Sequence, residues 1–266
     1  MIVLPMAGLG SRFTKAGFNC PKYMLPLAEG TMFSGVVQGF ENCFDTEPFL
    51  FIVRQMPGVN EFIATELRRL APVPSRWEIA VLDAPTSGQA ETVYKGLVGQ
   101  GLRLSDTDIT IFNIDTRYAR FTHPAEFSRR DVDGYLDVVM AAGDHWSFVR
   151  PECERAGHCR VAEVAEKRRI SQYCSTGLYH FRQVRVFCDL YEQSLGTDVT
   201  KLPGRERYVA PLYNMALSKG MDIRYRIVDK DSITFTGTPG EYFDALGKHG
   251  LSQPGVQDTE AGAPGS

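Results

Sequence analysis

Residues 4–13 read LPMAGLGSRF, and residues 21–27 read PKYMLPL. The apolar run over residues 1–6, which includes the start of the first segment, predicts a buried β-strand that ends in a glycine loop. Gly8 and Gly10 let the backbone approach an anion closely, because a glycine has no side chain that would stand in the way. Successive amide groups in such a turn form a cradle for a phosphate group. The start of the chain therefore predicts a strand followed by a phosphate-binding turn.

Two side chains after the glycines add positive charge. Arg12 carries a fork of donors that suits phosphate oxygens, and Lys22, which stands between two prolines, adds a point charge one loop later. Two other phosphate loops are excluded. The dinucleotide fingerprint needs a third glycine where Phe13 stands, and the P-loop ends in Gly-Lys-Ser/Thr, which this loop lacks. The alternative is an ordinary glycine-rich turn with a surface arginine and lysine, as in most isolated matches to short motifs.

Both segments together, Gly-x-Gly-x-Arg followed by Pro-Lys-x-x-x-Pro, resemble the signature of the sugar-phosphate nucleotidylyltransferases. The resemblance implies that the loop holds the triphosphate of a nucleotide. It also implies that Arg12 and Lys22 are the catalytic residues, which stabilise the transferring phosphoryl group. The nucleotide-binding residues that it implies in the loop are Met6, Ala7, Gly8, Leu9, Gly10 and Ser11.

Length and composition are those of an ordinary soluble globular protein, with 266 residues, of which 43% are hydrophobic and 23% charged. The net charge of −3 gives no global basic field, so nucleic acid is not an expected partner. The sequence has no apolar run of about 18 residues, so a membrane is not expected as a partner either. The first residues lack the basic region of a signal peptide, and the six scattered cysteines indicate reduced thiols. We therefore expect a cytoplasmic protein.

The first half of the chain alternates apolar strand patterns with amphipathic helical patterns. Predicted strands cover residues 1–6, 48–53, 77–82 and 107–114, and predicted helices cover residues 32–44, 61–70 and 91–98. This alternation predicts an α/β fold, namely a Rossmann-like, doubly wound, mostly parallel sheet with helices on both faces. After residue 131, short strands separated by turns predict a mixed sheet with added antiparallel strands around an acceptor cleft. Ligands of such sheets bind beyond the carboxyl ends of the strands.

We expect one nucleotidyltransferase domain over residues 1–250. Residues 1–130 are its predicted nucleotide-binding half, and residues 131–250 its predicted acceptor-binding half. Residues 251–266 are rich in glycine, proline and alanine without any apolar period, and they predict a disordered tail.

The segment after the third predicted strand contains Thr86, Gly88 and Gln89. Gly88 opens a predicted helix, so exposed amide groups at the start of that helix face the cleft. The resemblance implies that this segment contacts the nucleobase and that these three residues bind the nucleotide. The family often has a glutamine where Thr86 stands, which leaves the identity of the base open. The alternative is an ordinary helix N-terminus capped by Ser87 or Thr86.

Asp115 directly follows the fourth predicted strand. A carboxylate there can bind a Mg²⁺ ion that bridges phosphate oxygens, since Mg²⁺ takes one or two carboxylates and keeps its waters. The segment Asn113-Ile114-Asp115 is similar to the family pattern, which implies Asp115 as a metal ligand and Mg²⁺ as the cofactor. The alternative is a surface aspartate that caps a turn. Thr236 and Phe235 occupy the positions where much of the family has a second acid, so the second metal ligand stays open.

Four residues of the second half are acceptor-binding candidates. Glu166 and Lys167 precede Gly177, which lies in a Gly-x-Tyr-x-Phe segment, in the order found in the family. The resemblance implies that the glutamate binds sugar hydroxyls, that the lysine binds the acceptor phosphate, and that Gly177 lies close to the acceptor. Asn214 is a fourth candidate. The alternative for the Glu-Lys pair is a solvated ion pair on the surface.

The resemblance implies nucleotidylyl transfer, an EC 2.7.7-type reaction between a nucleoside triphosphate and a phosphorylated small-molecule acceptor. A sugar 1-phosphate is the expected acceptor, and several variant motifs look like a branch found among capsule and surface-polysaccharide enzymes. A cytidylyltransferase acting on a small non-sugar phosphate or phosphonate and a catalytically silent nucleotide-sugar sensor are the alternatives. A glycosyltransferase would need Asp-x-Asp after the fourth strand, where Asn113-Ile114-Asp115 supplies one acid. The base, the acceptor and the formation of a homo-oligomer are left open.

Overall fold

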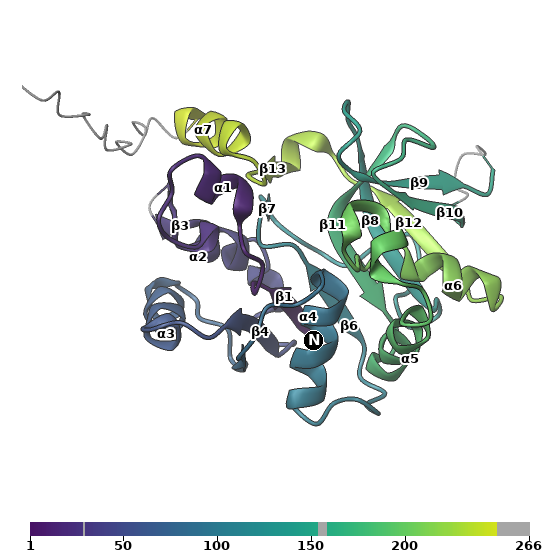
Figure 1. The fold of residues 1–266 in the computed structure, drawn as a ribbon, viewed down its shortest axis with the longest axis horizontal. Helices are drawn as coiled ribbons and strands as arrows, with labels where there is room; N and C mark the ends of the chain where they lie inside the picture. Colours follow the sequence, from purple (N-terminus) through teal and green to yellow (C-terminus); the bar gives the residue numbers. More distant parts are fainter. Residues whose placement is uncertain (29, 154–158, 249–266) are drawn as a thin grey trace, which may run out of the picture.

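The computed structural model describes residues 1–28, 30–153 and 159–248 (Figure 1). The disordered tail predicted at residues 251–266 lies outside the described residues. None of the helices within the described ranges is long and apolar enough to cross a membrane.

A mixed sheet of nine strands forms the centre of the described chain. Its strands are β1 (Ile2–Pro5), β4 (Phe49–Arg54), β5 (Trp77–Leu82), β6 (Ile109–Phe112), β8 (Gly134–Met140), β9 (Ser147–Pro151), β10 (Val161–Glu166), β11 (Tyr173–Phe181) and β12 (Ile223–Ile227). Strands β6, β1, β4 and β5 are parallel neighbours in that order. Strand β11 pairs antiparallel with β6, β8 and β9, and β12 pairs parallel with β8. The predicted parallel sheet with added antiparallel strands is therefore confirmed.

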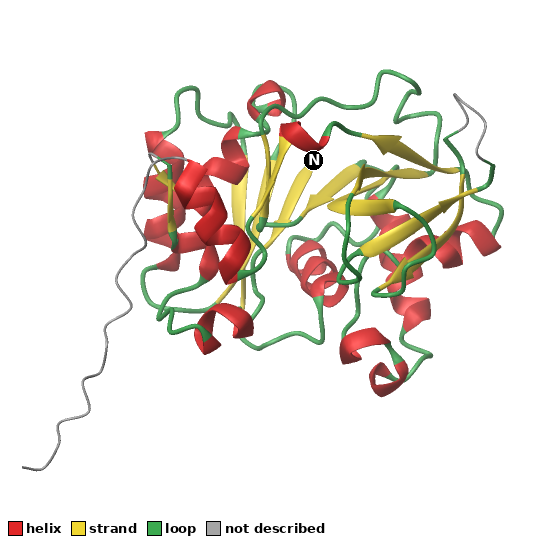
Figure 2. Ribbon diagram, turned by 90° about the horizontal axis from the view of Figure 1, so that it is seen from above, coloured by secondary structure: helices red, strands yellow, loops and turns green. Residues whose placement is uncertain are grey.

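Helices cover both faces of this sheet (Figure 2). One face packs against α2 (Met32–Gln38) and α3 (Val59–Arg69), and the other against α4 (Gln89–Gly99), α5 (Val184–Ser194) and α6 (Leu212–Ser218). Strand β4 illustrates why, because successive residues of a strand point to opposite faces. Phe49 and Phe51 belong to the core under α2 and α3, whereas Leu50 and Ile52 belong to the core under α4. An almost continuous apolar run is what a strand buried on both faces requires.

The predicted helix over residues 32–44 is shorter in the structure. Helix α2 ends at Gln38, and a 3₁₀ turn over Glu41–Cys43 follows. Gly39 closes the helix at a point where a Cβ atom would lie 2.7 Å from the backbone oxygen of Tyr118. Close packing there leaves no room for a side chain. Phe40 and Phe44, which suggested a longer helix, flank the 3₁₀ turn and are buried.

The C-terminal helix α7 (Pro239–Lys248) lies beside α1 (Ser11–Lys15) at the top of Figure 1. Tyr242 packs edge-on against Phe13, with their ring centroids 6.0 Å apart, and its hydroxyl donates to the backbone oxygen of Pro26 at 2.8 Å. Two small sheets support this end of the molecule, β2 (Pro26–Leu27) with β3 (Gly30–Thr31) and β7 (Thr116–Tyr118) with β13 (Ile233–Phe235). This packing places the start of α7 next to the glycine loop.

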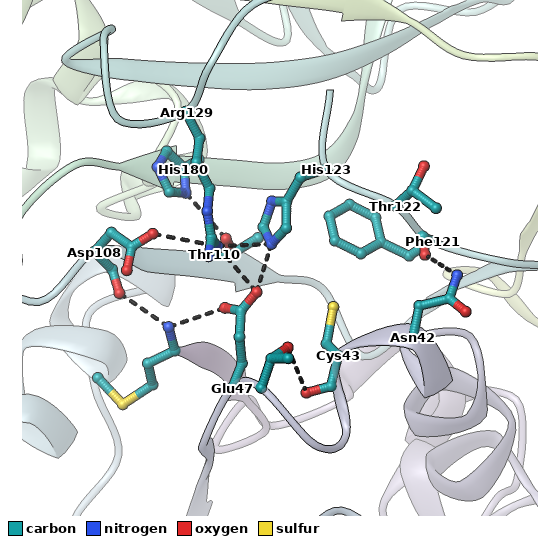
Figure 3. Close-up of polar contacts among 12 residues, drawn as sticks. Asn42, Cys43, Glu47, Asp108, Thr110, Phe121, Thr122, His123, Arg129 and His180 are labelled. Carbon is teal, nitrogen blue, oxygen red and sulfur yellow. Dashed lines mark hydrogen bonds and ion pairs between the residues drawn. The ribbon is translucent and has the colours of Figure 1, made fainter. Parts of the chain in front are cut away.

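A cluster of charges lies at the amino ends of β1 and β6 (Figure 3). The carboxylate of Glu47 contacts the terminal ammonium of Met1 at 3.0 Å, His123 Nε2 at 2.5 Å and Arg129 Nη1 at 2.9 Å. Burial alone would raise the pKa of Glu47, but the hydrogen bond from His123 and the charges of the Met1 ammonium and Arg129 lower it. Cys43 Sγ lies within 4.8 Å of a carboxylate oxygen of Glu47 and of a ring nitrogen of His123. Since the carboxylate is already satisfied by cations, the cluster acts as a structural ion-pair network.

Candidate active site

A cleft of about 480 Å³ lies at the carboxyl ends of β1 and β6 and is lined by residues from both halves of the chain. The predicted site residues that line it are Met6, Ala7, Gly8, Leu9, Gly10, Ser11, Arg12, Lys22, Thr86, Gly88, Gln89, Asp115, Glu166, Lys167 and Gly177. The position of the cleft agrees with the rule that ligands of open α/β sheets bind beyond the carboxyl ends of the strands.

The glycine loop connects β1 to α1 along one wall of the cleft. Gly10 adopts a left-handed backbone conformation (φ 61°, ψ 30°), which a glycine enters without steric cost. The backbone bonds of α1 begin with the amides of Phe13 and Thr14, which donate to Gly10 O at 2.9 and 3.1 Å. The amide groups that precede Phe13 therefore lie ahead of the helix ladder, where an anion can accept from them. Arg12 is exposed in the same wall.

Lys22 and Asp115 form an ion pair in the cleft, although they are 93 residues apart in the sequence. Lys22 Nζ lies 2.5 Å from Asp115 Oδ2, and the two side chains are 23% and 24% exposed. Thr236 holds the backbone of the aspartate, because its amide and hydroxyl donate to Asp115 O at 2.8 and 3.1 Å. The structure thus brings the predicted catalytic lysine and the predicted metal ligand into direct contact.

The segment that was predicted to contact the base is ordered by its own hydrogen bonds. Thr86 Oγ1 donates to Gly88 O at 3.2 Å and shares a 2.7 Å hydrogen bond with Thr92 Oγ1. Helix α4 begins at Gln89, two residues earlier than predicted, and its N-cap is Gly88, with no side-chain cap. Capping by Ser87 or Thr86 is therefore wrong. Ser87 instead donates through its amide and its hydroxyl to Glu91 Oε2, both at 2.5 Å.

Gln89 and Gly177 meet at Asn113, which directly follows β6 and precedes the metal candidate by two residues. The side-chain Nε2 of Gln89 donates to Asn113 Oδ1, and the backbone amide of Asn113 donates to Gly177 O at 3.1 Å. Gly177 has a φ of +85°, and a Cβ atom there would collide with the side chain of Asn113. This contact joins the nucleotide side of the cleft to the acceptor side.

The acceptor candidates Glu166 and Lys167 lie at the end of β10. Glu166 accepts a hydrogen bond from Ser147 Oγ, and burial raises the pKa of its carboxyl group. Lys167 Nζ donates to the hydroxyl of Tyr208 and lies 4.6 Å from the centroid of its ring. The alternative of a solvated surface pair does not describe Glu166, which is 8% exposed.

Asn214 is the predicted site residue that the structure does not bring to the cleft. Its Oδ1 accepts from the amide of Val164 at 2.8 Å, and its Nδ2 donates to Val164 O at 2.6 Å. The side chain is therefore occupied by the backbone of β10 and holds α6 against that strand. This corrects the assignment of Asn214 to the acceptor.

Among the cleft residues that sequence reasoning did not select are Glu206, Tyr208 and Glu241. Glu241 forms a capping box with Thr238, since Thr238 N donates to Glu241 Oε2 at 2.9 Å and Glu241 N donates to Thr238 Oγ1 at 3.2 Å. The Thr-x-x-Glu spacing of a capping box was the available signal for this glutamate. No comparable signal existed for Glu206 and Tyr208, which lie in an irregular segment.

No protein-family model matches the sequence, and none of the curated proteins matches it. Among solved structures, a nucleoside-diphosphate-sugar pyrophosphorylase from Vibrio cholerae is 41% identical, with a TM-score of 0.84 over 92% of this chain and 99% of that chain.

Two more distant structures share the fold. The UTP-bound UGPase from Acinetobacter baumannii is 16% identical, with a TM-score of 0.66 over 96% of this chain and 94% of that chain. An inositol-1-phosphate CTP transferase from T. maritima is 15% identical, with a TM-score of 0.65 over 95% and 97%. The 41% identity to the first structure over nearly its whole length settles the family. This chain belongs to the sugar-phosphate nucleotidyltransferase family.

Proposed function

We propose that this protein joins a nucleoside triphosphate to a sugar 1-phosphate and releases a nucleoside-diphosphate sugar and pyrophosphate. One observation carries the proposal: Arg12, Lys22 and Asp115 line one cleft, and Glu166 and Lys167 line the same cleft from the other half of the chain. The charges required on both sides of the transferring phosphorus are thereby present. The relationship to a nucleoside-diphosphate-sugar pyrophosphorylase supports the same reaction.

In the reaction, an oxygen of the acceptor phosphate attacks the α-phosphorus of the triphosphate in line. The new bond joins the acceptor oxygen to that phosphorus, and the bond to the β-phosphate oxygen breaks, so that pyrophosphate leaves with the electron pair. The acceptor is already an anion near neutral pH, so no general base is needed. Catalysis then consists of positioning and charge neutralisation.

The chain's own residues divide these tasks. Arg12 and the amides of the glycine loop hold the leaving pyrophosphate, and Lys22 neutralises charge that develops at the α-phosphate. Lys167 holds the acceptor phosphate, and Glu166 accepts hydrogen bonds from the acceptor's hydroxyls. Gln89 contacts the base together with the backbone of its loop. The amide of Ala90 is not free for this purpose, because it donates to Arg207 O at 2.9 Å.

The acidic side chains of the cleft fit a Mg²⁺ ion. A Cβ atom placed on Gly237 would lie 3.3 Å from Asp115 Oδ2 and 3.5 Å from Glu241 Oε2, so two carboxylate oxygens face the space that this glycine leaves open. Hard oxygen ligands, one or two of them carboxylates, are what Mg²⁺ prefers. When bound, the ion would neutralise charge on the phosphate oxygens. Asp115 is its proposed ligand. Glu241, whose Oε2 lies beside the same space, is the proposed second carboxylate, since Thr236 and Phe235 stand where much of the family has an acid.

We further propose that the reaction takes place in the cytoplasm and supplies nucleotide sugars for surface polysaccharides. The sequence variants Asn-Ile-Asp-Thr at residues 113–116 and His-Trp-Ser at residues 145–147, which resemble that branch, support the assignment. Cytoplasm is where nucleoside triphosphates are abundant.

A substrate screen tests the proposal. Each of the four nucleoside triphosphates is combined with sugar 1-phosphates and with small phosphates or phosphonates, and pyrophosphate release is measured with and without Mg²⁺. We expect turnover with a sugar 1-phosphate and one preferred triphosphate, lost on Arg12→Ala. Turnover with CTP and only non-sugar phosphates would replace the proposal by the cytidylyltransferase alternative. Calorimetric binding of a nucleotide sugar without any turnover would replace it by a sensor.

A further inference from the structure

Glu206, Arg207 and Tyr208 cross between two walls of the cleft. Glu206 and Tyr208 line the cleft, whereas Arg207 between them is buried, with 9% of its surface exposed. Glu206 has extended backbone dihedrals (φ −130°, ψ 149°), and successive side chains of an extended segment point to opposite sides. We call these three residues the 206–208 strap. The reaction proposed above gives Arg207 no role.

On the nucleotide side, the strap is bonded to the loop before α4. The amide of Arg207 donates to Ser87 O at 2.8 Å, and the amide of Ala90 donates to Arg207 O at 2.9 Å. Gly88 lies between these two bonds, and a Cβ atom there would stand 2.5 Å from Arg207 N and 2.6 Å from Arg207 O. A glycine is therefore required at position 88 for the strap to reach the loop.

The side chain of Arg207 fixes the strap from behind. Its Nη1 donates to Ser194 O and its Nη2 to Thr197 O, each at 2.8 Å. Ser194 is the last residue of α5, where backbone carbonyls lack partners within the helix and carry the negative end of its dipole. Two nitrogens of a rigid guanidinium can serve two carbonyls at once, which the single ammonium of a lysine cannot do in the same way.

On the acceptor side, the strap contacts the lysine of the Glu-Lys pair. Lys167 Nζ donates to the hydroxyl of Tyr208 and lies over its ring. The backbone of Lys167 has a φ of +54°, a left-handed conformation that L-residues with side chains adopt only when their surroundings hold them there. Tyr208 is one of the groups that holds this lysine.

We propose that Arg207 is a positioning residue that couples the nucleotide loop to the acceptor lysine through the 206–208 strap. Because the same three residues touch both sites, ordering of one site by its ligand reduces the cost of ordering the other. Each substrate therefore binds more tightly in the presence of the other. The inference rests on the proposed function for the identity of the two ligands, whereas the mechanical coupling rests on the hydrogen bonds alone.

The first measurement is hydrogen exchange of the protein without added ligand, since it requires no substrate. It compares Arg207→Met with Arg205→Met, which removes the same charge from an exposed side chain of the same loop. We expect Arg207→Met to speed exchange about fivefold at the amide of Ala90 and at residues 166–168, the factor that corresponds to the net contribution of one typical intramolecular hydrogen bond. Arg205→Met leaves both segments unchanged.

Steady-state kinetics then distinguishes positioning from a general structural role. With the pair of substrates that reacts fastest in the screen, Arg207→Met raises both KM values about fivefold or more, with a smaller change in kcat. Gly88→Ala, on the nucleotide side of the strap, raises the KM of the acceptor as well. Arg207→Lys recovers less than half of the lost affinity, because it lacks the fork.

Faster exchange confined to residues 194–208, or equal changes in Arg207→Met and Arg205→Met, would overturn the coupling. If Arg207→Met does not fold, Arg207→Lys and Gly88→Ala are compared in its place by the same exchange measurement. If Arg207→Met speeds exchange at Ala90 and at residues 166–168, but the unmodified protein turns over no substrate in the screen, the coupling through the strap is supported and the proposed function is rejected.

Discussion

Replacing Lys22 by alanine distinguishes a catalytic ammonium from a structural one. The ammonium contacts Asp115 at 2.5 Å, but both side chains are about a quarter exposed, at 23% and 24%. An ion pair of that exposure contributes at most about 1 kcal/mol to stability, because solvent screens it. In the transition state, by contrast, the same ammonium faces charge that develops at the α-phosphate. The loss of one such group typically costs about 2.7–4 kcal/mol, or about 10²–10³-fold in kcat.

We therefore expect a large loss of activity together with a small loss of stability. Pyrophosphate release measures the first, and urea unfolding followed by circular dichroism measures the second. Lys15→Ala is the matched control, since Lys15 is an exposed lysine on the neighbouring helix α1 and does not line the cleft. Near-normal turnover in Lys22→Ala would refute the catalytic role. A loss of stability of 3 kcal/mol or more, at any activity, would refute the argument from exposure, which allows about 1 kcal/mol.

Three further predictions concern the interior and the junction of the two sites. Burial lowers the pKa of His180 well below 6.5, so the folded protein keeps this imidazole neutral while the unfolded chain takes up a proton below pH 6.5. The free energy of unfolding thus falls as pH falls, by about 2 kcal/mol at pH 5 if the folded imidazole is still neutral there. Urea unfolding at several pH values should show that His180→Gln makes the free energy of unfolding depend less steeply on pH. Arg226→Leu leaves the fully buried Asp137 without its guanidinium partner and should lower the free energy of unfolding by about 3–5 kcal/mol in urea. Arg224→Leu on the same strand, whose partner Asp222 is 21% exposed, should lower it by about 1 kcal/mol or less. Equal costs would contradict the burial argument. Gly177→Ala should raise the KM of the triphosphate about tenfold. The new Cβ displaces Asn113 from its bond with Gln89, and the left-handed backbone adds about 1–2 kcal/mol of strain. An unchanged KM would show that the contact between Gly177 and Asn113 does not affect nucleotide binding.

Local sequence patterns were sufficient for the class of fold and for the glycine turn after β1. The apolar run of β1 and the strand-helix alternation depend on neighbours within a few residues, so periodicity reports them directly. The carboxyl-end rule then placed Lys22 and Asp115 in one cleft without any coordinates, because parallel strands end at the same edge of the sheet.

Local patterns could not predict the roles of residues that depend on partners distant in the sequence. Asn214 was assigned to the acceptor from its place in the sequence, yet the tertiary structure pairs it with the backbone of Val164. Tyr208 carries no local motif, and its contact with Lys167 arises only when the irregular segment after α5 packs against the end of β10.

What the sequence by itself indicated is the kind of chemistry to expect after β1 and β6, since the glycines at 8 and 10, one guanidinium and one carboxylate suit phosphate and a metal ion. Only the tertiary structure decided which other residues lie beside those groups. Gly88 leaves room for Arg207, and Gly237 lies beside Asp115, because segments more than a hundred residues apart pack within a few ångströms. Close packing of this kind depends on the whole fold, and no window of sequence contains it.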